Sequence, residues 1–131
     1  MKIEQHQEAL KEHLTQLERG IEEGVEESQR NIAFNISQGS VELFAMYLHH
    51  LNLIEGSGDQ LDHRIFRSKN LIDKKLPPQF PKKHEILKIM KYIQDERNAL
   101  CYGSRKPEKR VQELIKSFRN LQKMLGNDKK K

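Results

Sequence analysis

The residue with the clearest chemical potential in this sequence is Arg97, which interrupts the apolar stripe of a helix predicted over residues 83–102. A spacing of three or four residues puts position 97 on the same helix face as the apolar members of that stripe. Those members are Ile86, Met90, Ile93 and Leu100. Because a guanidinium taken out of water without a partner costs several kcal/mol, Arg97 is expected to bind an acidic side chain or an anion.

A second predicted helix, over residues 28–54, offers an acidic partner for Arg97. It is apolar most of the way round, which is typical of the central helix of a bundle. One polar stripe interrupts it, formed by Asn35, Gln38, Glu42 and His49. Glu42 is the expected partner of Arg97, with Gln38 in support. If this pair is only structural, the alternative function is a non-catalytic helical protein-interaction module. Arg97 can also extend to the rim of the bundle and keep its charge in water.

Two polar residues follow Arg97 towards the end of its helix. Asn98 can orient a phosphate that Arg97 binds bidentately. Tyr102 is rotated by about 140° from Arg97, so the two converge only at the helix end or across a second chain. A phenol titrates near about 10 and is a poor base beside an imidazole, which titrates near about 6.5. Four histidines that are more simply explained as surface or capping residues are alternative sources of an imidazole: His49, His50, His63 and His84.

Charge is distributed unevenly along the chain, although the net charge is only +5. Residues 1–59 contain 4 Lys or Arg against 11 Asp or Glu, and residues 60–131 contain 20 against 8. A basic half can attract polyanions such as RNA, although oppositely charged helices that lie side by side produce the same split. Together with Arg97, the candidate RNA or phosphate contacts are Arg105, Lys106, Lys109 and Arg110.

The segment 97–103, Arg-Asn-Ala-Leu-Cys-Tyr-Gly, is followed by a short turn and an amphipathic final helix, and it resembles the HEPN superfamily. Members of that family typically carry an Arg, a polar residue and, a few positions later, a His, whose place Tyr102 takes here. Residues 37–48 resemble the long second helix of the family, and His63 lies in a stretch that resembles its middle region. The resemblance spans roughly residues 28–125.

This resemblance implies a homodimer in which two copies of the motif face each other across a cleft. Many family members are metal-independent ribonucleases, often toxins paired with a nucleotidyltransferase antitoxin, and others bind RNA or nucleotides without cleavage. It therefore implies an RNA- or nucleotide-phosphate-binding dimer, or a degenerate toxin-type ribonuclease, with Arg97, Asn98 and Tyr102 in the catalytic positions. Because Tyr102 replaces the proton-carrying His, we expect cleavage to be lost or weak. The family needs no metal, and we expect no cofactor.

The elements that position these residues are all predicted to be helical, since no segment alternates with period two. The expected fold is a single all-α domain over residues 1–131, an up-and-down bundle of four long helices and one short one, with 128–131 as a frayed basic tail. Three prolines within residues 77–81 predict an extended loop over 74–81. The predicted helices span about 2–27, 28–54, 60–72, 83–102 and a fifth that begins at Pro107.

Several other chemistries are excluded or disfavoured. There is no apolar run of about 18 residues, so no membrane span is predicted, and the N-terminus is too acidic and polar for a signal peptide. The lone Cys101 cannot form an internal disulfide or a Cys-rich zinc site, which favours a cytoplasmic location and no metal. Cys101 lacks an evident base and is expected to be a small packed or interface residue.

Overall fold

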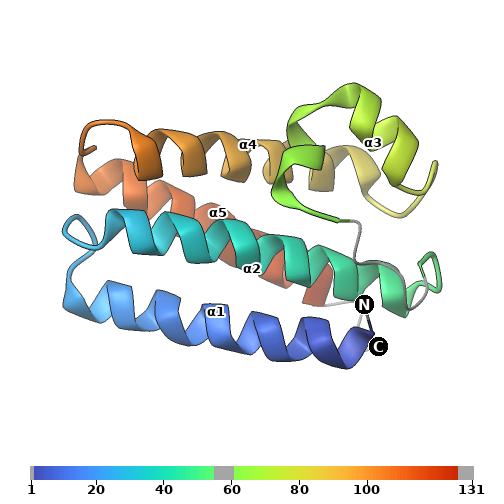
Figure 1. Cartoon of the computed structure of the whole chain (residues 1–131), viewed down its shortest axis with the longest axis horizontal. Helices are drawn as coiled ribbons and strands as arrows, with labels where there is room; N and C mark the ends of the chain where they lie inside the picture. Colours follow the sequence, from blue (N-terminus) through green and yellow to red (C-terminus); the bar gives the residue numbers. More distant parts are fainter. Residues whose placement is uncertain (1, 55–60, 127–131) are drawn as a thin grey trace.

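The computed structural model describes residues 2–54 and 61–126 of the chain, and throughout them the regular structure is helical, which confirms the predicted all-α class. The four long helices run alternately up and down side by side, and the two short ones lie beside the first half of the third long helix, α4 (Figure 1). The elements are α1 (Ile3–Glu23), α2 (Gln29–His50), the 3-10 helix η2 (His63–Arg67), α3 (Lys69–Lys75), α4 (Lys83–Tyr102) and α5 (Glu108–Gly126).

The central element is α2, which packs against α1, α4 and α5. Its apolar residues point to more than one side, so it can bury surface against three helices at once. Six of them have no exposed surface at all: Ile32, Ala33, Ile36, Phe44, Ala45 and Leu48. This central place confirms the prediction made from the broad apolar surface of residues 28–54.

The register of α4 against α2 is set by a buried polar contact. Ser37 donates a hydrogen bond to the side-chain oxygen of Gln94 over 2.5 Å, and both residues are almost fully buried. Because a buried polar group is costly without its partner, this contact opposes sliding of the two helices. The next inward position of α4 towards its C-terminus is Arg97, which therefore lies beside the first half of α2.

The prediction of a single short helix over residues 60–72 is wrong, because the structure contains two short helices in this region, η2 and α3. Ser68 has an extended backbone, and its hydroxyl accepts a hydrogen bond from the amide of Leu71, which starts α3 as a separate helix. The side chain of Asp62 caps η2 in the same way. The predicted loop over 74–81 begins only after Lys75, because α3 continues to that residue and the extended residue before the proline is Leu76.

The other boundaries differ by a few residues. The prediction for 83–102 is confirmed, but α1 ends at Glu23 and α2 at His50, each earlier than expected. Gly24, with φ of 131°, follows α1, and α5 begins at Glu108 directly after Pro107. The helix predicted from residue 28 begins one residue later, and Ser28, which precedes α2, makes no capping hydrogen bond with its side chain. The basic tail predicted at 128–131 and residues 55–59, which follow the predicted second helix, lie outside the described residues.

Within residues 2–54 and 61–126, none of the helices is both long and apolar enough to cross a membrane.

Phe44 anchors the short helices on the bundle, and its truncation tests this packing. The Phe44 ring makes edge contacts with Phe66 of η2 and with Phe80, at centroid distances of 5.4 and 5.6 Å. Phe44→Ala is expected to lower the free energy of unfolding by about 3–5 kcal/mol, because it leaves a cavity among fully buried rings. The same change at the exposed Phe34 of α2 is the matched control, with an expected loss of about 1 kcal/mol. Equal losses in urea denaturation would contradict the packing described here.

Candidate functional site

Arg97 is buried, with 8% of its surface exposed, as its place on the apolar stripe predicts. Its guanidinium carbon lies over the ring of Phe34, 5.6 Å from the ring centroid. Among the described residues Arg97 takes part in no ion pair or hydrogen bond, and its Nε is buried without a partner. A contact with an aromatic ring offsets only about 0.5–2 kcal/mol of the cost of burying a cation. The structure therefore leaves Arg97 with an unused donor and an uncompensated charge.

The predicted ion pair between Arg97 and Glu42 is wrong. Glu42 instead lies 2.6 Å from the Nδ1 atom of His6 on α1, and both side chains are largely buried. Arg97 lies beside Phe34 of α2. Phe34 precedes Glu42 by eight residues, so the two positions are about 12 Å apart along the axis of α2. The signal that could have revealed His6 is its position on the apolar stripe of α1, four residues before the core residue Leu10.

Two titratable side chains respond to the charge of Arg97. The pKa of His63 in η2 lies below its ordinary value, first because of burial and then because the charge of Arg97 disfavours the imidazolium, against an opposing effect of Asp62. Burial raises the pKa of the Cys101 thiol, while the charges of Arg97 and Arg30 act in the opposite direction. The charge of Arg97 thus acts on residues of η2 and of α4, and among the four candidate histidines this effect is seen at His63.

Cys101 is half-buried, and its thiol contacts the backbone carbonyl of Arg30 over 3.6 Å. This contact places the last turn of α4 against the first turns of α2. The arrangement agrees with the expected packing role of the cysteine.

The structure does not join Tyr102 to Arg97. Tyr102 is the last residue of α4 and is 73% exposed, whereas Arg97 is buried. Asn98 is half-buried, and within the described part of the chain neither Asn98 nor Tyr102 hydrogen-bonds to Arg97. Gln38, predicted to support the site, is half-buried one helical turn after Phe34. Within one chain, Asn98, Tyr102 and Gln38 therefore do not form a joint site with Arg97, and Arg97 is the candidate phosphate contact.

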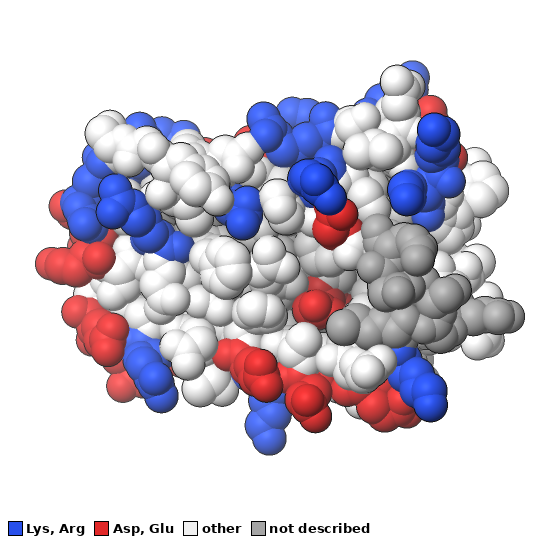
Figure 2. All heavy atoms as spheres, viewed as in Figure 1, with Lys and Arg blue, Asp and Glu red and all other residues white. Residues whose placement is uncertain are grey.

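The basic cluster lies where α4 ends and α5 begins, and Figure 2 shows Lys and Arg side chains gathered at that end of the bundle. Arg110 donates two hydrogen bonds to the carboxylate of Glu96, at 2.9 and 2.8 Å, so its charge is largely compensated. Arg105 donates to the backbone carbonyl of Glu26, which leaves its charge available. Lys109 is exposed. Of the predicted contacts, Arg105 and Lys109 present the freest charge to an anion.

The loop that carries this cluster is held in place by a buried amide. The side chain of Gln29 donates to the backbone carbonyl of Lys106 over 2.9 Å and accepts from its backbone amide over 2.8 Å. The predicted candidate Lys106 thus contributes mainly through its backbone, although its half-buried amine also lies 3.5 Å from the hydroxyl of Ser104. This double contact fixes residues 103–107 relative to the start of α2.

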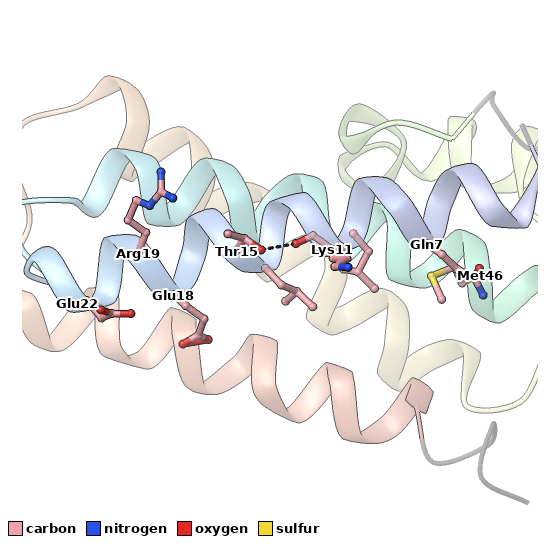
Figure 3. A pocket seen from close by; sticks show the side chains of 9 residues that line it. Gln7, Lys11, Thr15, Glu18, Arg19, Glu22 and Met46 are labelled. Atoms are coloured by element: carbon pink, nitrogen blue, oxygen red, sulfur yellow. Dashed lines mark hydrogen bonds between the residues drawn. The ribbon is translucent and has the colours of Figure 1, made fainter.

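A groove of about 620 Å³ lies on another part of the surface, along α1 (Figure 3). Met46 of α2 lines the groove together with residues of α1, which include Glu18, Arg19 and Glu22. None of the residues predicted to bind phosphate lines this groove. In residues 2–54 and 61–126, no three His, Cys, Asp or Glu side chains are grouped so that they could hold a metal ion.

Comparison with protein-family models, curated proteins and solved structures found no match to this chain. The function of the site is therefore inferred from its own chemistry.

The proximity of Arg97 to His63 can be tested by titration. Arg97→Met is expected to raise the pKa of His63, because it removes a positive charge that disfavours the imidazolium. Arg119→Gln is the matched control: it also removes one positive charge, but Arg119 is paired with Glu18 and does not act on His63. Imidazole resonances followed by NMR between pH 5 and about 8 measure both. An unchanged His63 pKa in Arg97→Met would contradict the arrangement.

Proposed function

We propose that this chain binds the phosphate groups of RNA or of nucleotides through Arg97, in a HEPN-like homodimer whose ribonuclease activity is weak or lost. The observation that carries the proposal is the buried guanidinium of Arg97, which has no carboxylate partner among the described residues and a buried Nε without an acceptor. Removal of one partner from a buried ion pair is strongly unfavourable. A phosphate supplies two acceptor oxygens and the missing negative charge.

The surroundings of Arg97 favour an anion over a neutral ligand. Arg30 and Arg97 both lie near enough to act on Cys101, and Arg105 and Lys109 add positive charge where α4 ends and α5 begins. His63 is biased towards its neutral form, so it can donate or accept a hydrogen bond beside the phosphate. The alternative, an interaction module held by an Arg97–Glu42 pair, loses its main support because Glu42 binds His6.

The dimer is proposed from the resemblance of residues 97–103 and of the order of helices to the HEPN superfamily. In a homodimer, a second copy would bring its own Arg97 and exposed Tyr102 towards the first. The same resemblance suggests a cytoplasmic toxin–antitoxin pair in which a nucleotidyltransferase is the antitoxin. Its proton chemistry would need Tyr102 or the neutral imidazole of His63, because the usual histidine of the motif is replaced.

RNA binding by charge variants tests the proposal. Arg97→Met is expected to weaken binding of a mixed-sequence single-stranded RNA by about tenfold or more and to lower the salt slope by about 1, since one phosphate contact is lost. Arg119→Gln, with the same change in charge, is expected to leave the affinity within about twofold. Filter binding at two salt concentrations gives both quantities.

Two results would contradict this function. Unchanged RNA affinity in a folded Arg97→Met protein would remove the phosphate contact, and thermal melting shows whether the variant is folded. Robust metal-free cleavage of RNA by the natural chain that is absent in Arg97→Ala would show that full ribonuclease activity is retained.

A further inference from the structure

Phe34 is an exposed aromatic side chain that neither the core nor the phosphate contact explains. It lies on the central helix between the buried residues Ala33 and Asn35, yet 42% of its surface is exposed. The chain has 5 Phe and 3 Tyr, all within the described residues. Of these eight rings only Phe34 and Tyr102 are exposed, and the others are buried or packed against the core. Tyr102 belongs to the same end of the bundle, where α4 meets the start of α2.

Two cation–ring contacts are found in the described residues, and they differ in which partner is exposed. At Phe80, the ring is 7% exposed and a surface lysine, Lys83, lies 5.8 Å from its centroid. At Phe34 the ring is the outer partner and the cation is the inner one, 8% exposed. A ligand whose anionic group reaches Arg97 must therefore lie close to the exposed ring.

The Phe34 ring is also held in a fixed environment. His13 of α1 lies 6.3 Å from it, with the two ring planes inclined by 72°. The imidazole of His13 is itself fixed by a hydrogen bond of 2.9 Å to the side-chain oxygen of Asn35. The guanidinium of Arg97 contacts the ring from α4. A ring that is held by two helices and open to solvent loses little freedom when a flat ligand covers it.

Figure 2 shows an uncharged surface over α2, between the acidic surface of α1 and the basic surface around α4. A ligand that fits this face combines an apolar plane with a negative charge beside it. The basic groups near Phe34 come from its own helix and from α4, since Arg30 lies one turn before it on α2 and Arg97 contacts its ring. This combination is the chemistry of a nucleotide, in which a planar base is joined to a phosphate.

We propose that Phe34 is a base-stacking residue and that the site takes an unpaired nucleotide, with its base on Phe34 and its phosphate at Arg97. The inference rests on the phosphate contact proposed above and adds the part of the ligand that Phe34 recognises. Bases within a duplex already stack on their neighbours and are not accessible to a protein ring, whereas unpaired bases are. The site therefore selects single-stranded over double-stranded RNA, with little preference among the bases.

Substitution of the ring separates stacking from charge. Phe34→Leu is expected to weaken binding of a single-stranded RNA roughly 5- to 150-fold while leaving the salt slope unchanged, because it removes a stacking surface and no charge. Binding of the same sequence as a duplex is expected to stay unchanged. Leu53→Ala is the matched control, since Leu53 is also exposed, at 39%, and follows the other end of α2.

Phe34→Trp gives a direct signal, because the chain contains no other tryptophan. Its affinity is expected to match that of the natural chain, and single-stranded RNA is expected to quench its fluorescence, whereas inorganic phosphate and duplex RNA are not. Saturable quenching by adenosine monophosphate at similar concentrations would identify a free nucleotide as a sufficient ligand. Quenching by the strand alone would show that several nucleotides are needed.

The outcomes distinguish this inference from the function on which it rests. If Arg97→Met loses RNA binding and Phe34→Leu retains it, the stacking role is overturned and the phosphate contact stands. If the natural chain does not bind RNA at all, both are overturned. If Phe34→Leu converts a dimer into a monomer by size-exclusion chromatography without a change in affinity per chain, the ring belongs to an interface between copies and the stacking role is overturned.

Discussion

A guanidinium that is held out of water without a carboxylate is unfavourable, and the interior of this bundle keeps one. The helical period of α4 places Arg97 on its apolar stripe, and the Ser37–Gln94 contact brings it beside Phe34, a ring with no charge to offer. Four other arginines of the described chain are compensated by carboxylates, in the pairs Arg64–Asp62, Arg67–Asp95, Arg110–Glu96 and Arg119–Glu18. Arg97 differs from the described arginines that lack a carboxylate at the surface, Arg19, Arg30 and Arg105, because it alone is buried, and burial makes a partner energetically necessary. This imbalance is what an external anion would remove.

The central helix α2 presents polar side chains to α1, where Asn35 contacts His13, and an aromatic ring, Phe34, to α4. Towards its C-terminal half, Glu42 faces α1 and binds His6, so the acidic and histidine-bearing residues of the first two helices satisfy each other. Towards its N-terminal half, Phe34 faces α4 and contacts Arg97, close to the basic turn that Gln29 fixes through Lys106. The charge asymmetry of the sequence thus has two consequences in the fold. Oppositely charged helices do pack on the same central helix, and a basic surface remains at one end.

Periodicity predicted the helices well, and it predicted the site less well, for a physical reason. The spacing of apolar residues in α4 predicted the bounds of this helix and the burial of Arg97 correctly, because each of these properties follows from the sequence of a single helix. The partner of Arg97 depends on the register between two helices, which one stripe does not determine, and so Glu42 was paired with the wrong residue. Phe34 was not singled out because an aromatic residue within an apolar run is usually core. The division at Ser68 was missed because its capping hydrogen bond competes with helix continuation only locally.

The central claim, that Arg97 holds a buried and available cation, can be tested at the Nε atom itself. A ¹⁵N-resolved NMR spectrum shows the arginine Nε–H groups, and the signal missing in Arg97→Met identifies that of Arg97. On addition of a short single-stranded RNA, this signal is predicted to move in a saturable way as the phosphate becomes its acceptor. An Arg97 signal that stays fixed at saturating RNA, while signals from other arginines move, would contradict the account.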